Sequence, residues 1–187
     1  MSKDLIKQFR EKAGAVSAEV FTAPDQGRAL DMALEWLRQE QKLRVTADDR
    51  LTGLLAAAKT SGLNLSFPDR PEQFAELQAA LVEADFAVAE TGTLVHLDAT
   101  PRDLWRWTLP ENCLAFIDRR KIAANMEELL EAFNAYLSAG GKEGEGSPAN
   151  EVKQISFVTG PSRTADIEGQ LELGVHGPLR LLIFIYG

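Results

Sequence analysis

The sequence predicts an α/β protein in which helices cover a mostly parallel sheet. Stretches with helical periodicity alternate along the chain with short apolar stretches. The late apolar stretches, 113–118 and 179–186, are almost continuously apolar, which is typical of strands buried on both faces of a parallel sheet. Two apolar runs within 84–98, separated by a short polar turn, indicate a hairpin or a strand–loop–strand unit and add some antiparallel character.

Composition limits the class of protein. The chain has 187 residues, of which 45% are apolar and 26% charged, and its net charge is −8. We expect one domain, 1–187, with a core large enough to fold without a metal or disulfide. The acidic excess disfavours nucleic acid and a polybasic membrane contact. No run approaches the ~18 apolar residues of a membrane span, and the first residues do not resemble a signal peptide, so we expect a cytoplasmic protein.

The chain has one cysteine, Cys113, at the start of an apolar run. One cysteine cannot form a disulfide within the chain, and an iron–sulfur cluster needs about four thiolates. With His96 and His176 as the two histidines, we expect no structural zinc site either. We therefore expect no cofactor to be bound by this chain, and we interpret Cys113 as a buried strand residue.

The first 84 residues form a helix-rich portion in this interpretation. Helical periodicity predicts helices at 2–13, 25–41, 51–62 and 70–84. Strands are expected at 43–49 and 64–67, and an edge strand or loop at 15–21. Asp48 or Asp49 would cap the helix at 51–62.

The remaining residues, 85–187, form the expected sheet core. Here the pattern predicts a surface loop at 100–112, a buried strand at 113–118, a helix at 126–137 and a flexible insert at 139–153.

The closing stretch, 156–187, organises the functional interpretation. A strand at 156–159 ends at Gly160-Pro161, and a short helix with Ile167 and Leu171 on its buried face follows. Such a strand–loop–helix junction would present backbone N–H groups at the carboxyl edge of the sheet, where open α/β sheets bind ligands.

Two segments resemble a known family. VTGPSRTADIE (158–168), followed by GVHGP (174–178), closely resembles the C-terminal signature of the lactate utilisation protein C family, also called the LUD domain. AETGTLV (89–95) resembles a second segment of that family, and the resemblance covers 85–187. It implies a fold similar to the NagB/RpiA/CoA-transferase group, a three-layer α/β/α sandwich, which periodicity alone does not single out.

The polar turn at Glu90, Thr91, Gly92 and Thr93 is the first candidate site. Glycine permits a positive φ or a close backbone approach to a ligand. An ordinary hairpin turn is the alternative. The resemblance favours a turn that faces a ligand, with Glu90 as a candidate catalytic carboxylate.

The second candidate site follows Gly160. Arg163 can hold a carboxylate or phosphate with two hydrogen bonds, or form a surface ion pair with Asp166 or Glu168. Ser162 and Thr164 are candidate helix caps or ligand contacts. Asp166 would brace Arg163 or act as a general base.

Three further residues complete the candidate set. The family motif suggests that His176 is a proton carrier or ligand clamp, although a histidine in a turn is often only a polar turn residue. His96 is expected to pack within its strand. Arg102 stands where family members carry an arginine before a Leu-Pro dipeptide, and Cys113 stands where many of them carry a histidine. Trp105 and Trp107 would share one face of an extended segment.

The resemblance implies a function. It indicates an accessory component of L-lactate oxidation to pyruvate, with iron–sulfur partner proteins and a small anionic metabolite bound by Glu90–Thr93, Gly160–Asp166 and His176. A free-standing isomerase or acyl-transfer enzyme, with Glu90 or Asp166 as base or nucleophile, is one alternative. A non-catalytic interaction module, docking through Trp105 and Trp107, is another.

Overall fold

The computed structural model describes residues 3–42, 44–51, 62–98, 100–138, 154–165, 171–173 and 177–187. The helices are α1 (Lys3–Ala15), α2 (Gln26–Gln39), α4 (Pro71–Ala75), α5 (Pro101–Thr108) and α6 (Met126–Ser138), with short 3-10 helices η1 (Asp49–Leu51) and η2 (Arg119–Lys121). The strands are β1 (Glu19–Ala23), β2 (Arg44–Ala47), β3 (Asn64–Leu65), β4 (Ala79–Glu83), β5 (Phe86–Val88), β6 (Thr93–Asp98), β7 (Asn112–Asp118), β8 (Ile122–Ala123), β9 (Gln154–Val158), β10 (Arg163–Ala165), β11 (Leu171–Leu173) and β12 (Arg180–Tyr186).

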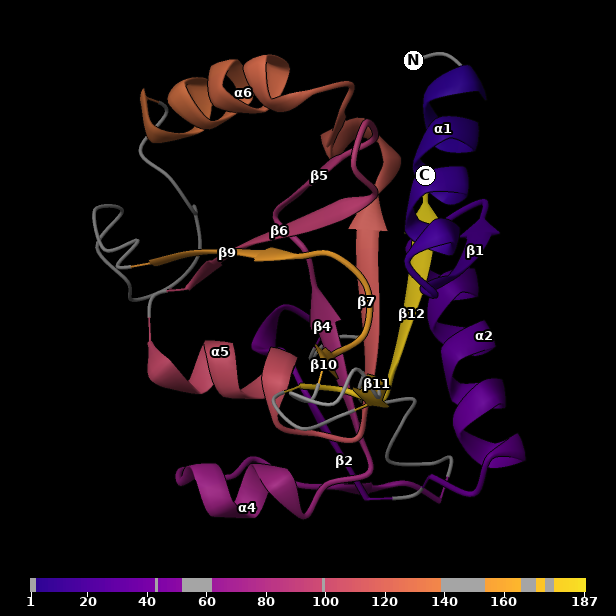
Figure 1. The fold of residues 1–187 in the computed structure, drawn as a ribbon. Helices are drawn as coiled ribbons and strands as arrows, with labels where there is room; N and C mark the ends of the chain where they lie inside the picture. The colour runs from indigo at the N-terminus through magenta and orange to yellow at the C-terminus, as the bar shows by residue number, and fades with distance from the viewer. Residues whose placement is uncertain are drawn as a thin grey trace.

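A six-stranded sheet with the order β1-β12-β7-β4-β2-β3 forms the centre of the molecule. Every strand pair described in it is parallel. Figure 1 shows β12, the yellow strand, running beside β7 and β1. The predicted mostly parallel sheet is therefore confirmed, and so are the strands expected at 113–118 and 179–186.

The central strands are buried on both faces. Leu114 and Phe116 of β7 pack in a cluster with α2, whereas Cys113 and Ala115 pack on the opposite face with α1. Because each face has its own helical cover, neither face of these strands needs polar residues. Cys113 is a buried strand residue, as predicted, and burial raises the pKa of its thiol.

A second sheet has the order β8-β5-β6-β9. β5 and β6 form the predicted antiparallel hairpin, and β9 pairs antiparallel with β6. One face of this sheet joins the core on the α1 and α5 side of the central sheet, and α6 covers the other face through Leu129. Helices thus flank the central sheet on both sides, which confirms the layered α/β architecture (Figure 1).

The helix predicted at 70–84 is wrong over its second half. Helix α4 ends at Ala75, and Ala79–Glu83 forms β4 between β2 and β7. The apolar residues of this stretch fit a helical face and a buried strand equally well. Burial on both faces of the central sheet decides in favour of the strand.

Two predicted segments lie outside the described residues: most of the helix at 51–62 and the insert at 139–153. Within the described part of the chain, we find no helix that combines the length and the apolar character needed to cross a membrane.

Candidate functional site

The turn at Glu90–Thr93 joins β5 to β6 and rests against the end of α1. Gly92 has a φ of 69°, and its N–H donates to the Val88 carbonyl at 2.9 Å. A Cβ atom added to Gly92 would lie 2.3 Å from the backbone nitrogen of Ala13. The close backbone approach expected at this glycine is therefore an approach to helix α1, and it fixes where the turn sits.

A chain of hydroxyl groups links this turn to the second candidate segment. Thr91 Oγ1 donates to Thr93 Oγ1 at 2.7 Å, and Thr93 Oγ1 lies 2.7 Å from Thr159 Oγ1. The next residue, Gly160, has a φ of 79°, and a Cβ there would lie 2.6 Å from the Val16 carbonyl oxygen just beyond α1. We call Thr91, Thr93 and Thr159 the hydroxyl corner. It brings together two segments that the sequence singled out separately.

The segments around Ser162 and Pro178 also meet. The Ser162 N–H donates to the Pro178 carbonyl at 2.9 Å, and a Cβ on Gly177 would lie 3.0 Å from the Ser162 Cβ. This contact lies at the amino end of β12, where the Leu179 N–H donates to the Glu111 carbonyl at 2.8 Å. The expectation that this junction sits at the carboxyl edge of the sheet is wrong, because β9 belongs to the second sheet and not to the central one.

The short helix predicted after Gly160 is wrong over the residues that the structure describes there, 163–165 and 171, whereas Ile167 lies outside the described residues. Arg163 and Thr164 belong to β10, which pairs antiparallel with β11, and Leu171 is the first residue of β11. The residues that directly follow Ser162 and Thr164 are therefore in a strand and not in the first turn of a helix, so the predicted helix caps are wrong. Two turns of isolated helix are marginal, whereas β10 and β11 satisfy each other's backbone groups. The candidate residues Asp166 and His176 lie outside the described residues.

Glu90 and Arg102 are both exposed. The Glu90 N–H donates to the carbonyl of Ala124, the residue directly after β8, at 3.0 Å. This hydrogen bond holds the turn beside the end of β8. Arg102 lies in the first turn of α5, so the surface loop expected at 100–112 is wrong over these residues. Thr100 and Asp103 form a capping box at the start of α5, with proline at its first position.

The two tryptophans of α5 do not share one face. Trp107 is 1% exposed and packs in the core, with its ring 5.1 Å from that of His96. Trp105 is half-buried and lies edge-on against Phe74 at 5.9 Å. The expected extended segment is wrong because the residues are helical, and a docking surface built on both tryptophans loses its geometric basis.

A buried charge network that the sequence did not reveal lies beyond the carboxyl ends of β2 and β4. Arg50 Nη1 donates to Asp85 Oδ1 at 2.7 Å, and its Nε and Nη2 donate to Asp48 Oδ2 at 3.0 and 2.6 Å. Arg50 Nη2 also donates to the Glu83 carbonyl. The Asp48 and Asp85 side chains are 11% and 7% exposed, so both charges are compensated inside the protein.

His96 belongs to this network. It is 3% exposed within β6, which confirms the prediction that it packs within its strand. Its Nδ1 lies 3.0 Å from Asp85 Oδ2, and Asp85 Oδ2 also accepts the Leu97 N–H at 2.8 Å. The imidazole is therefore held between a carboxylate and the Trp107 ring.

Charge pairing in the network outweighs burial. Burial alone would raise the pKa of Asp48, but the charge of Arg50 and its hydrogen bonds lower the pKa below the ordinary 3.8. Burial alone would lower the pKa of Arg50, but Asp85 and Asp48 raise it. Asp48 and Arg50 consequently stay ionised at neutral pH.

The lowered pKa of Asp48 predicts acid sensitivity. The carboxylate stabilises the fold above its unfolded pKa, about 3.9, and this contribution disappears as the pH falls through the lower folded value. We expect the unfolding free energies of wild type and Asp48→Asn, measured in urea, to differ most between pH 5 and 7 and to converge as the pH falls below about 4. A difference that stays constant with pH would contradict an ionised Asp48.

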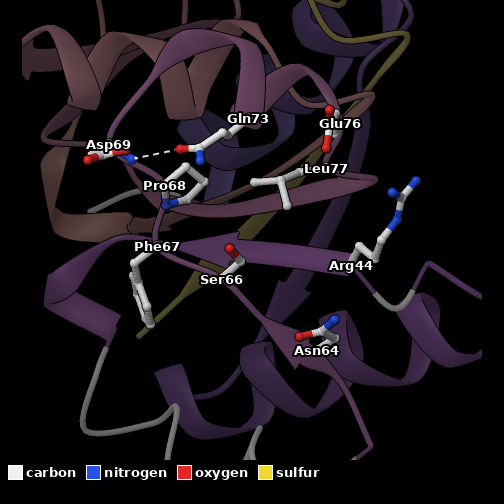
Figure 2. A pocket seen from close by; sticks show the side chains of 9 residues that line it. All are labelled: Arg44, Asn64, Ser66, Phe67, Pro68, Asp69, Gln73, Glu76 and Leu77. Carbon is white, nitrogen blue, oxygen red and sulfur yellow. Dashed lines mark hydrogen bonds between the residues drawn. The ribbon is translucent and has the colours of Figure 1, made fainter.

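A pocket of about 540 Å³ lies elsewhere, near the β3 edge of the central sheet. Figure 2 shows Arg44 at one end of its lining and Asp69 at the other, with the Asp69 N–H bonded to Gln73 Oε1 at 3.3 Å. The described residues that line it are Arg44, Asn64, Ser66, Phe67, Pro68, Asp69, Gln73, Glu76 and Leu77. None of these residues was a candidate from the sequence, and none belongs to the hydroxyl corner.

Comparison with known proteins adds relatives and a fold neighbour. Lactate utilization protein C of Exiguobacterium sp. is 27% identical over 188 residues, covering 96% of this chain and 76% of that protein. Lactate utilization protein C of Halalkalibacterium halodurans is 30% identical over 109 residues, covering 58% of this chain and 44% of that protein, so this match spans less than half of that relative.

A crystal structure of a DUF162 family protein from Deinococcus radiodurans has the same fold, with a TM-score of 0.66 at 17% identity, covering 100% of this chain and 99% of that one. A family model described as the LUD domain matches residues 6–186. Because this match spans nearly the whole sequence, the chain belongs to the LUD domain family.

Proposed function

We propose that this protein works in L-lactate utilisation as a component that binds a small anionic metabolite. The observation that carries the proposal is the name lactate utilization protein C, borne by a relative that aligns with 96% of this chain. The part of the proposal that concerns the metabolite rests on the residues around the hydroxyl corner.

Iron–sulfur partner proteins are part of the proposal. Oxidation of lactate to pyruvate releases two electrons and two protons, and the electrons need an acceptor. The single buried cysteine of this chain cannot hold a cluster, which needs about four thiolates. The electrons would therefore pass to clusters on partner proteins, and this chain would act as an accessory component.

The metabolite would bind beside the hydroxyl corner. Thr91, Thr93 and Thr159 supply hydroxyl groups there, and the Ser162 segment continues from Thr159 towards β10. Arg163 would supply the positive charge for a carboxylate. Gly160 and Gly92 set the course of the chain, and Arg102, Thr164, Glu90, Asp166 and His176 remain candidates for further contacts or proton transfer.

Isothermal titration with L-lactate, pyruvate and a sugar phosphate tests the binding step. We expect heat from lactate or pyruvate, and a Kd about 10–100-fold weaker in Arg163→Ala, because hydrogen bonds to charged groups contribute about 1.5–3 kcal/mol. Arg38→Ala, an exposed arginine of α2, is the matched control and should bind like wild type. Equal heats from wild type and Arg163→Ala would remove Arg163 from the site.

Reconstitution with the iron–sulfur proteins tests the role in oxidation. We expect lactate-dependent reduction of an artificial electron acceptor only when this chain and its partners are combined. Turnover by the isolated chain, abolished by Glu90→Gln, would instead favour a free-standing enzyme of the isomerase or acyl-transfer type.

A further inference from the structure

Exposed apolar side chains gather on helix α6 and strand β9. Of the seven large apolar residues that are exposed in the described part of the chain, five belong to these two elements: Met126, Leu130, Leu137, Ile155 and Phe157. Leu130 and Phe157 are 56% and 51% exposed. We call these five residues the α6–β9 surface. Single exposed apolar residues are common, but a gathered set of them marks an interaction site.

The α6 part of this surface is one stripe along the helix. Its residues recur at spacings of four, three and four positions, which places them on one side of α6: Met126, Leu130, Phe133 and Leu137. Phe133 is the half-buried member, and it packs against the cluster that contains Leu129 and the β5–β6 hairpin. The exposed stripe therefore borders the face of the second sheet that α6 covers.

The two β9 residues lie on that same face of the sheet. Phe157 pairs with Val95 and Ile155 pairs with Leu97, and paired residues of an antiparallel ladder project to one face. Val95 and Leu97 pack in one cluster with Leu129 of α6. Because α6 packs mainly on β5 and β8, Ile155 and Phe157 lie beyond the helix on the face that it packs against.

Neither the edge of β9 nor the segment before it protects this surface. β9 is the last strand of its sheet among the described residues, and its five residues include no charge and no proline, which are the usual protection of an exposed edge. The segment 139–153, which joins α6 to β9, contains no leucine, isoleucine, methionine or aromatic residue. The sequence between the two elements thus supplies little apolar area for burial against them.

Charge indicates the kind of partner. α6 contains three glutamates, Glu127, Glu128 and Glu131, and no lysine or arginine. Glu127 and Glu131 are exposed, and helical spacing places them beside the stripe, on its side away from the buried cluster. A second copy packed through α6 would bring these glutamates together across a two-fold axis, where like charges repel. A partner with basic residues complements them.

From these features we infer that the α6–β9 surface binds an amphipathic helix of a partner protein, with lysine or arginine beside its apolar face. Its apolar stripe packs along that of α6, because residues spaced by three and four form the ridges and grooves of two packed helices. The stripe from Met126 to Leu137 is about 16 Å long, so the contact engages roughly 11 residues of the partner. The inference is independent of the proposed function, because this surface contains no residue of the hydroxyl corner.

Wild-type protein labelled with ¹³C in its methionine methyl groups tests the inference. The chain has three methionines, of which Met126 lies on the surface and Met32 packs on the α2 side of the central sheet. The probes are two synthetic peptides of about 18 residues, long enough to be helical, with the same leucine stripe and either lysine or glutamate on the polar face.

We expect the lysine peptide to shift the Met126 signal and to leave the Met32 signal unchanged. The glutamate peptide should bind at least about tenfold more weakly, because its charges face Glu127 and Glu131. If neither peptide moves the Met126 signal at millimolar concentration, or if both bind equally well, the inference is overturned.

Two serine variants test the apolar part of the contact. Leu130→Ser should weaken the Kd of the lysine peptide at least about tenfold, because the leucine loses its burial in the complex. Phe67→Ser removes an exposed apolar side chain beside the pocket near β3, so it is the matched control and should bind like wild type. Both side chains are exposed, so we expect both variants to fold, and circular dichroism checks this. Equal affinities for wild type and Leu130→Ser would contradict the inference.

Charge variants separate local pairing from the general attraction of a basic peptide to an acidic protein. Glu127→Gln combined with Glu131→Gln should weaken binding of the lysine peptide about threefold or more at low salt. Asp31→Asn combined with Glu35→Gln removes the same charge from the exposed face of α2 and should bind like wild type. Equal losses in the two double variants would attribute the effect to net charge and overturn the choice of a basic partner.

Two measurements test the other possible occupants. In sedimentation of the protein alone, a dimer at micromolar concentration that Leu130→Ser dissociates would make the occupant a second copy of this chain. Phosphatidylcholine vesicles that shift the Met126 signal would make it a lipid surface. Either result overturns the inference, whereas a monomer that ignores vesicles and binds the lysine peptide supports it.

Discussion

Replacing Arg50 with methionine is expected to lower the free energy of unfolding by about 3–5 kcal/mol, because it leaves buried carboxylates without a counter-charge. The Arg50 guanidinium forms ion pairs with both carboxylates, with Nη2 at 2.6 Å from Asp48 Oδ2 and Nη1 at 2.7 Å from Asp85 Oδ1. In a domain of this size the loss corresponds to a fall in Tm on the order of 10 °C. Urea titration at pH 7 and thermal unfolding followed by circular dichroism measure it.

Two further variants test whether the unpaired buried charge causes the loss of stability in Arg50→Met. Arg120→Gln removes a comparable arginine–aspartate contact, with Asp118 at 2.5 Å, but the Arg120 side chain is 81% exposed, so we expect little change. Adding Asp85→Asn to the Arg50→Met variant should restore part of the stability, because it removes one of the unpaired carboxylates. A double variant that is as unstable as the sum of its single changes would contradict this explanation.

Gly92→Ala is expected to destabilise the protein by about 2–4 kcal/mol, through a left-handed backbone and an overlap that the structure cannot easily relieve. The φ of Gly92 is 69°, and the added methyl group would lie 2.3 Å from the Ala13 nitrogen and 2.7 Å from its Cα. Both obstacles are backbone, so no side chain can rotate out of the way. Chemical denaturation measures the loss.

Gly14→Ala is the matched control, because Gly14 is the next residue after Ala13 in the same helix. A Cβ on Gly14 meets nothing within 4 Å. Since alanine favours helix over glycine by about 0.5–1 kcal/mol, this change should stabilise the protein. Equal effects from Gly14→Ala and Gly92→Ala would contradict the assigned contact between α1 and the turn.

The strands that the sequence predicted best are those marked by a pattern of consecutive residues within the strand itself. β7 and β12 are continuous apolar runs bounded by turns, and both faces of each are buried. The β5–β6 hairpin was predictable because its polar turn separates two apolar runs. These patterns require no knowledge of the neighbouring elements.

Other elements depend on tertiary context or on a signal that was overlooked. Ala79–Glu83 is apolar enough for either a helix or a strand, and only its place between β2 and β7 makes it a strand. Helix α5 had a usable local signal, because Thr100, Pro101 and Asp103 match a capping box with proline at the first position.

The site was predicted only in part. The motifs around Thr93 and Thr159 do meet, although 66 positions separate them in the sequence. The charge network was missed because Arg50 and His96, 46 positions apart, share no motif and become neighbours only through folding.

The position of β12 has a consequence for biosynthesis. This strand lies between β1 and β7 and pairs with both, yet the ribosome synthesises it after both of them. In the nascent chain, the edge of β7 that pairs with β12 therefore stays unpaired until residues 180–186 have emerged from the ribosomal exit tunnel. Open strand edges invite association with other chains, so this interval is when the protein most needs protection by chaperones.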